Sequence, residues 1–316
     1  MLRDVNIESY MVPINTERDE MLPEFPTHNF DHVVLAIRLP NSEPPLHLDA
    51  EIHDSQLGRM LIFDPTSSYV PVGQLPSYLQ ANYGFLAREG GGQLLALPLV
   101  SAESSRRTRM GKFALTPSRT LSGEISEIST GNQAAEVRPL WQFEPTAERT
   151  KRVENFLAHF LPQLSLTSYD VQNLSDINRD IAVHYAFGSE GFARPAGNFI
   201  VVRPCVLGRY SQSMMEKTEP HEFPVDFDHT GIDEDDYSIG LPPGYSADDM
   251  PDPVDLSEDF AEYHSHINLS AGALHYRRTL TTKKLTVPVN ELPQLKEFYR
   301  KIAIDESSGV LLRPGS

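Results

Sequence analysis

The chain has 316 residues, 40% of them hydrophobic, which is enough for two or three domains with substantial cores. Its formal net charge of −17 argues against nucleic acid or an anionic membrane surface as a partner. The single cysteine excludes an internal disulfide framework and a cysteine-based zinc cluster. No stretch has the length and hydrophobicity of a membrane span, and no N-terminal segment has the pattern of a secretory signal.

The first predicted elements are strands. Residues 4–15 form one, and the apolar, branched run at 33–37 forms a second, which His32 precedes. A third covers residues 60–63 and ends at Asp64, because the proline that follows stops strand pairing and starts a turn. The polar segment 40–59 predicts a long surface loop between the second and third strands.

Two adjacent strands of this kind can hold the His32 imidazole beside the Asp64 carboxylate. An imidazole lowers the pKa of a neighbouring thiol and later returns the proton to the leaving group. A carboxylate on the far side of the ring fixes its tautomer and stabilises the imidazolium. By periodicity alone, a histidine before a strand is also common as a surface or capping residue, and an aspartate before proline is common in turns.

The order of motifs resembles the bacterial transglutaminase-like family, a Cys-His-Asp superfamily related to papain-like enzymes. The resemblance rests on NF-x-HVVLA followed by FDPTSSYVPVGQLPSYLQ, on the lead-in strand at 5–16, and further on upon ALTPSRTLSGEISEISTG, PVDF and KKL-x-VP. It implies that His32 is the catalytic base and Asp64 its partner. It also implies an α+β fold, with an incomplete antiparallel transglutaminase-like sheet followed by a mostly antiparallel β domain with packed helices.

The family's nucleophile is a cysteine in a Gly-Asp-Cys segment at a helix start, where the helix dipole stabilises a thiolate. No cysteine precedes His32 here. We therefore expect either the C-terminal part of a longer enzyme or a form that has lost its nucleophile. Cys205 comes too late in the chain for this role, and its apolar surroundings predict a buried structural thiol.

The remaining pattern divides the chain into residues 1–100 and a β-rich accessory domain at 101–316. In the first part we expect a short helix at 72–83, a glycine turn at 90–92 and a strand at 94–100. In the accessory domain the apolar periodicity predicts two helices. One covers residues 147–160 and is capped by Thr146, and the other covers residues 292–304. Its expected strands cover residues 108–116, 121–130, 166–171, 181–187, 199–202 and 274–285.

Three sequence features resemble parts of ligand-binding or metal-binding motifs, but each departs from the motif and is better explained without a ligand. Residues 90–92 are not a phosphate loop, because no Lys-Ser/Thr follows the glycines. Asp226 and Asp228 begin a calcium-loop pattern that closes on Tyr237 instead of glutamate, so a solvated turn beside a strand is expected there. The aspartates at 248–259 in the same acidic stretch, 219–259, are expected to lie in exposed loop. His264 and His266 share a strand face but have no apparent third ligand. We expect no cofactor and no metal.

Two hypotheses remain. The first is a fragment of a thiol acyl-transfer or amide-hydrolysing enzyme that carries His32 and Asp64 and is inactive alone. The alternative is a non-catalytic envelope module with a degenerate transglutaminase-like fold that binds or spaces a protein or glycan. A bacterial periplasmic or envelope location follows from the resemblance alone, and the oligomeric state is not determined by the sequence.

Overall fold

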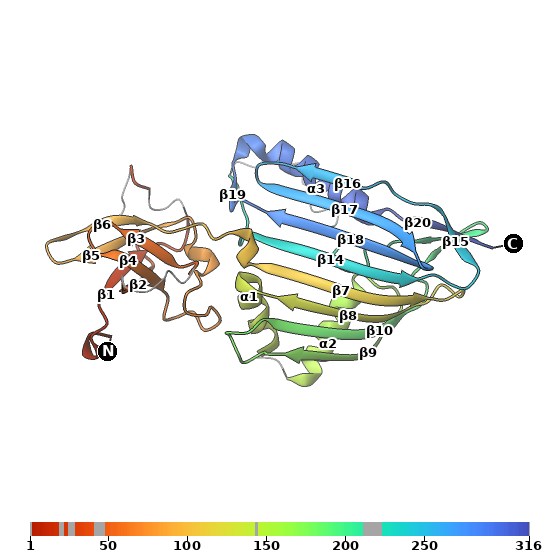
Figure 1. The fold of residues 1–316 in the computed structure, drawn as a ribbon, viewed down its shortest axis with the longest axis horizontal. Helices are drawn as coiled ribbons and strands as arrows, with labels where there is room; N and C mark the ends of the chain where they lie inside the picture. Colours follow the sequence, from red (N-terminus) through yellow and green to blue (C-terminus); the bar gives the residue numbers. More distant parts are fainter. Residues whose placement is uncertain are drawn as a thin grey trace.

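The computed structural model describes residues 2–18, 22–24, 29–40, 48–142, 145–210 and 223–315. Strands account for about 45% of the chain and helices for 19%, which is a sheet-rich α+β fold. The fold contains a six-stranded sheet, here called the small sheet, and an eight-stranded sheet, the large sheet, with separate hydrophobic cores (Figure 1).

The small sheet has the strand order β3-β4-β2-β1-β5-β6, and every neighbouring pair is antiparallel. Its strands are β1 (Ser9–Ile14), β2 (His32–Arg38), β3 (Glu51–Asp54), β4 (Gly58–Phe63), β5 (Tyr83–Arg88) and β6 (Gly91–Ala96). Three 3₁₀ turns flank them, η1 (Leu2–Val5), η2 (Ser77–Leu79) and η3 (Ala102–Ser104). On β2, Val34 and Ala36 are fully buried whereas Val33 is largely exposed, so only one face of the strand meets the core.

Two expectations for this region are wrong. The segment 40–59 is not wholly loop, because it contains β3, which pairs with β4 at the sheet edge; residues 41–47 lie outside the described part. The helix expected at 72–83 is reduced to the single turn η2, and Gly84 lies inside β5 instead of capping a helix. A side chain at Gly84 would collide with Val12 on β1, so strand contact explains this glycine.

The large sheet has the order β16-β17-β18-β14-β7-β8-β10-β9, with one parallel pair, β14 with β7. Its strands are β7 (Arg106–Leu115), β8 (Leu121–Ser129), β9 (Leu164–Gln172), β10 (Ile181–Ser189), β14 (Gly231–Gly240), β16 (Val254–Ser257), β17 (Ala261–Ser270) and β18 (Ala273–Thr282). The predicted hairpin of β7 and β8 is present, with Leu115 opposite Leu121.

Helices and a smaller sheet cover one face of the large sheet and leave the other face open (Figure 1). The helices are α1 (Gly131–Gln142), α2 (Thr146–Ala158) and α3 (Leu292–Ser307), with the turn η5 (Val289–Glu291) before α3. A four-stranded sheet contains β11 (Arg194–Ala196), β12 (Phe199–Val202), β15 (Tyr245–Asp249) and β20 (Val310–Pro314), and β13 (Val225–Asp226) pairs with β19 (Thr286–Val287).

The helix predictions are right in part. Helix α3 buries Leu295, Phe298, Tyr299 and Ile302, the inward face that the sequence predicts. Helix α2 begins at Thr146 itself, after Pro145, and has no side-chain cap, so the expected Thr146 cap is wrong. Helix α1 was not predicted; it carries Pro139 inside it and a weak apolar periodicity.

The acidic stretch 219–259 contains more strand than the expected solvated turn and exposed loop. It contains β14, a central strand of the large sheet, together with β13, β15 and β16, while residues 219–222 lie outside the described part. Asp235 on β14 is buried beside Arg109 on β7 and Arg278 on β18, at N–O distances of 3.3 and 2.7 Å. Paired charges can be buried where lone ones cannot, and this pairing was invisible in the sequence.

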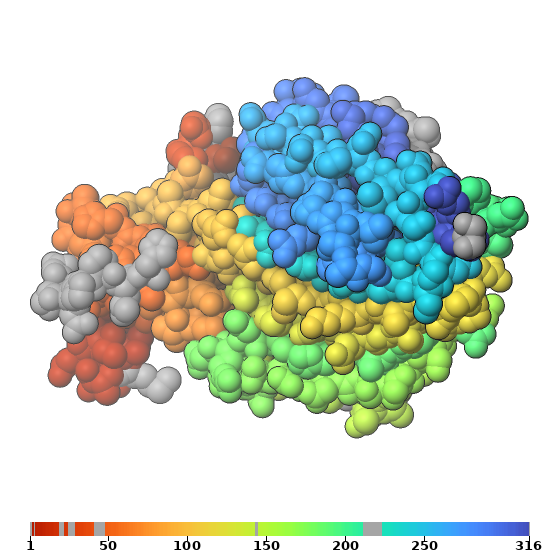
Figure 2. All heavy atoms as spheres, turned by 45° about the vertical axis from the view of Figure 1, so that its right-hand side comes forward, coloured from red at the N-terminus to blue at the C-terminus, as the bar shows by residue number. Residues whose placement is uncertain are grey.

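Hydrogen bonds join the small sheet to the large one. Thr230, just before β14, donates its buried hydroxyl to the carbonyl oxygen of Val100 at 2.6 Å. Ser104 in η3 donates to Asp49 at 3.0 Å. Figure 2 shows the two parts side by side, with the segment near residue 100 where they meet. The division into domains at residues 1–100 and 101–316 stays a prediction, although the two cores fall on either side of that position.

Candidate functional site

The structure brings the two predicted site residues together. His32 is the first residue of β2, and Asp64 directly follows β4, the strand that pairs with β2. Nε2 of His32 lies 2.8 Å from Oδ2 of Asp64, within hydrogen-bond distance. The imidazole remains 22% exposed while the Asp64 side chain is fully buried, so the ring is held from the protein side and is open to solvent on the other.

Asp64 is fixed by donors other than the imidazole. The backbone N–H and the hydroxyl of Thr66 donate to its Oδ1 at 2.9 and 2.7 Å, which closes a turn after the strand. The hydroxyl of Tyr78 donates to Oδ2 at 2.5 Å. Burial by itself raises the pKa of Asp64, but the hydrogen bonds from Tyr78, Thr66 and His32 outweigh it and hold that pKa below its ordinary value.

Tyr78 is the member of this site that the sequence analysis missed. It lies in η2, and its ring meets the His32 ring edge to face at 6.3 Å between centroids. Burial, and then the hydrogen bond to Asp64, raise the pKa of Tyr78 well above its ordinary value, so the phenol stays a donor. Its segment, GQLPSYLQ, has the pattern of the short helix expected at 72–83, and that pattern does not point Tyr78 toward His32.

The geometry assigns a role to each imidazole nitrogen. A carboxylate can only accept, so Nε2 carries the hydrogen that faces Asp64. In a neutral ring Nδ1 is then the basic nitrogen, and no partner for it is found within the described residues. A histidine held in this way can take a proton at Nδ1 while Asp64 stabilises the imidazolium.

No thiol of the described residues faces His32. Cys205 is 1% exposed and belongs to the core under the large sheet, whereas His32 and Asp64 belong to the small sheet. Its Sγ lies 3.4 Å from the carbonyl oxygen of Leu207, and burial raises the pKa of the thiol to about 12. The expectation of a buried structural cysteine agrees with this environment.

The described residues contain no group of three or more side chains that could hold a metal ion. Asp226 is exposed and accepts a hydrogen bond from Thr286 at 2.5 Å, as part of the β13–β19 pair. His264 pairs with Asp255 on the neighbouring strand β16 at 2.6 Å. None of the described helices is long and apolar enough to cross a lipid bilayer.

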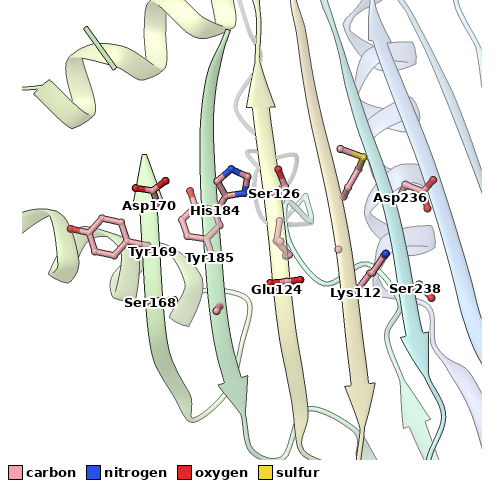
Figure 3. A pocket seen from close by; sticks show the side chains of 14 residues that line it. Lys112, Glu124, Ser126, Ser168, Tyr169, Asp170, His184, Tyr185, Asp236 and Ser238 are labelled. Carbon is pink, nitrogen blue, oxygen red and sulfur yellow. The ribbon is translucent and has the colours of Figure 1, made fainter. Parts of the chain in front are cut away.

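A second candidate region is a hollow of about 630 Å³ on the open face of the large sheet. Figure 3 shows Asp170, His184 and Ser126 in one row across β9, β10 and β8. Small residues form part of its floor, and carboxylates and one lysine surround them. Its polar lining residues are Lys112, Glu124, Ser126, Ser168, Tyr169, Asp170, His184, Tyr185, Asp236 and Ser238.

The C-terminal part of the chain matches a known domain family. Residues 198–312 match a family described as a Domain of Unknown Function with solved-structure structure (DUF3858). This match covers only the C-terminal part of the chain and leaves the small sheet outside it. No curated protein matches the sequence.

Three solved structures are similar in part. A "putative protease" from Parabacteroides distasonis ATCC 8503 has a TM-score of 0.43 at 9% identity, over 99% of this chain and 41% of that one. An M1 zinc metallopeptidase from Deinococcus radiodurans has a TM-score of 0.24 at 9% identity, over 68% and 42% of the two chains. A two-domain M1 zinc metallopeptidase bound to L-arginine has a TM-score of 0.25 at 9% identity, over 68% and 43%. The chain thus spans less than half the length of these proteins.

Proposed function

We propose that His32 and Asp64 are the base and the orienting carboxylate of a transglutaminase-like centre for thiol acyl transfer or amide hydrolysis. The observation that carries this proposal is the 2.8 Å contact between a buried carboxylate and a partly exposed imidazole. The thiol would be a cysteine outside the 316 residues. The resemblance in motif order supports the proposal independently of the geometry.

In this proposal, Nδ1 of His32 accepts the thiol proton, and the thiolate attacks the amide carbonyl carbon. The C–N bond then breaks, and the imidazolium returns the proton to the leaving amine, which leaves a thioester. Water or a second amine then attacks the thioester carbon and gives a proton to Nδ1. The C–S bond breaks, the imidazolium returns the proton to the thiolate, and the acid or the new amide is released. Asp64 keeps Nδ1 turned toward the thiol and stabilises the imidazolium, while Tyr78 and Thr66 hold Asp64 in place.

We expect the 316-residue chain by itself to show no hydrolysis and no transamidation of amide substrates. In the longest natural chain that contains these residues, a cysteine-directed electrophilic probe should label one cysteine outside them. His32→Ala should abolish that labelling at neutral pH, and Arg300→Ala, an exposed change on α3, should leave it intact. Mass spectrometry of the labelled peptide checks both results. Turnover by the 316-residue chain that survives Cys205→Ala and is lost in His32→Ala would refute the proposal as stated.

The second candidate function is a non-catalytic module that binds a protein segment on the open face of the large sheet. The favouring observation is the hollow of about 630 Å³, whose lining includes Asp170, Glu124 and Asp236 but a single lysine. Of these carboxylates, Asp236 is already paired with Arg277 at 2.8 Å. In a chain of net charge −17, this arrangement fits a basic segment.

Titration calorimetry with lysine- and arginine-containing peptides tests this alternative. Ser126→Trp fills the floor of the hollow and should remove binding, while Asn268→Trp, which is exposed on β17 outside the hollow, should not. Equal binding by both variants would exclude the hollow as the site.

A further inference from the structure

A separate hollow of about 480 Å³ lies where the ends of α2 and α3 approach β11 and β12. The described residues that line it include three arginines and a histidine but no aspartate or glutamate. The cationic side chains are Arg194, Arg203, Arg209 and His159. This composition is unexpected in a chain with 44 acidic and 27 basic residues, because random placement would put carboxylates beside such a cluster.

The three arginines reach the hollow from a sheet edge and a loop. Arg194 on β11 is the register partner of Val201 on β12, so these two side chains share a face of the sheet. Arg203 follows directly after the end of β12 and lines the same hollow. Arg209 is anchored, because its guanidinium donates to the carbonyl oxygens of Cys205 and Phe160 at 2.8 and 2.9 Å. Its guanidinium carbon also lies 5.7 Å from the centre of the Phe160 ring.

Arg194 and Arg203 form no ion pair and no hydrogen bond within the described part of the chain. Other arginines behave differently: Arg59 and Arg278 are held by carboxylates at distances of 2.6 and 2.7 Å. Arg203 is half-buried, and burial together with the positive charges of Arg194 and Arg209 lowers its pKa. Two donor-rich guanidinium groups are thus kept together, against their mutual repulsion, without a protein partner among the described residues.

We propose that this hollow binds a multiply charged oxyanion, through bidentate contacts with Arg194 and Arg203 beside the anchored Arg209. A planar guanidinium matches the oxygens of phosphate and carboxylate groups in geometry and charge. An anion would neutralise the repulsion among the arginines and satisfy their open donors. The volume exceeds that of a single phosphate and suits a phosphorylated or polycarboxylate small molecule. This site is distinct from His32 and Asp64 and does not depend on their chemistry.

The test is calorimetric titration of the full chain with inorganic phosphate and, separately, with citrate, at an ionic strength held constant with sodium chloride. We expect saturable binding of at least one of them; the tighter ligand identifies phosphate or polycarboxylate as the preferred chemistry. Arg194→Gln and Arg203→Gln should each weaken binding at least about 10-fold, because each removes a charge-assisted contact. Arg300→Gln, an equal charge change on the exposed side of α3, should stay within about twofold of the parent protein.

A melting curve separates binding from a purely structural role. Without anions, Arg203→Gln relieves repulsion and should melt no lower than the parent protein, whereas added anion should raise the Tm of the parent protein more than that of the variant. A lower Tm for Arg203→Gln without anions would assign Arg203 a structural role and overturn the proposal. So would the absence of saturable binding at about 10 mM of either anion, or an equal loss in Arg300→Gln.

Discussion

At the residue scale, the site depends on a carboxylate that burial and hydrogen bonding push in opposite directions. Desolvation favours the protonated form of Asp64, but the donors Tyr78, Thr66 and His32 favour the anion and prevail. Each donor is supplied by a different piece of the small sheet: a strand start, a turn after a strand and a single 3₁₀ turn. The imidazole is therefore oriented by a carboxylate that hydrogen bonds from other segments hold in place.

The lowered pKa of Asp64 makes a pH-dependent prediction. Because the folded-state pKa lies below the unfolded value near 3.9, the ionised carboxylate stabilises the fold above about pH 5, and this contribution is lost as the pH falls through the folded-state pKa. Asp64→Asn should lower the free energy of unfolding by about 1–3 kcal/mol at pH 7, and the difference should shrink below about pH 4. Urea denaturation at several pH values measures it. Asp252→Asn, an exposed control, should have no such effect, and a pH-independent loss for Asp64→Asn would contradict the prediction.

At the element scale, the large sheet depends on a close approach of β7 and β8. A Cβ at Gly123 would lie 2.1 Å from the carbonyl oxygen of Lys112 and 2.8 Å from the Cα of Phe113, both backbone atoms that cannot move aside. A methyl group added at Gly188, on the neighbouring strand β10, would have no neighbour within 4 Å among the described residues. The close approach of β7 and β8 thus requires glycine at position 123, whereas the space around Gly188 would accept a side chain.

These positions form a matched pair for mutagenesis. Gly123→Ala should force the β7–β8 backbones apart and lower the free energy of unfolding by more than about 2 kcal/mol. Gly188→Ala should be neutral or slightly stabilising, since it restricts the unfolded chain and meets no neighbour. Thermal or urea unfolding gives both values. Similar losses in the two variants would show that steric contact between β7 and β8 is not the cause.

Also at the element scale, a row of charges crosses the core face of the large sheet. Glu127, Arg109, Asp235 and Arg278 are successive neighbours on β8, β7, β14 and β18. Arg109 contacts Glu127 at 2.6 Å, and Arg278 pairs with Glu306 at the end of α3. The row fixes the register of four strands and attaches α3 to them, since a slip would leave buried charges unpaired.

At the scale of the whole molecule, the core of the small sheet is separate from the two apolar clusters that pack against the large sheet. The single tryptophan, Trp141, is buried in the core of the large sheet, so its fluorescence reports on that core alone, whereas far-ultraviolet circular dichroism reports on both sheets. The bond from Thr230 to Val100 is one of the links between the two parts.

Unfolding should therefore occur in two steps. We expect the fluorescence and dichroism transitions in urea not to coincide, because each core can lose its packing separately. Thr230→Val removes the buried donor to Val100, and should lower the stability of the less stable part by about 1–2 kcal/mol and separate the transitions further. Thr279→Val on the open face of the large sheet is the control. Coincident transitions in all three proteins would contradict this prediction.

Much of the fold was predictable where local pattern and burial agree. The strands that carry His32 and precede Asp64, the β7–β8 hairpin and the apolar face of α3 all follow from periodicity and turn chemistry. The strand β14 was not predictable, because a run of aspartates indicates a solvated segment. Only the fold places Arg109 and Arg278 beside Asp235 and so allows the strand to be buried. Helix α1 was missed because Pro139 interrupts its pattern, and strand β5 was missed because Gly84 was interpreted as the end of a helix.

The sequence by itself determined the sheet-rich class, the strands that carry His32 and precede Asp64, and the candidacy of these two residues, because each depends on residues close together in the chain. Only the tertiary structure decided that the imidazole meets the carboxylate, that Tyr78 supports it, and that three arginines converge on one hollow. Those outcomes depend on strand pairing and on segments distant in sequence. Burial of a charged group costs free energy, and a nearby partner of opposite charge offsets that cost. Whether such a contact is favourable therefore depends on which partners the fold places beside the group.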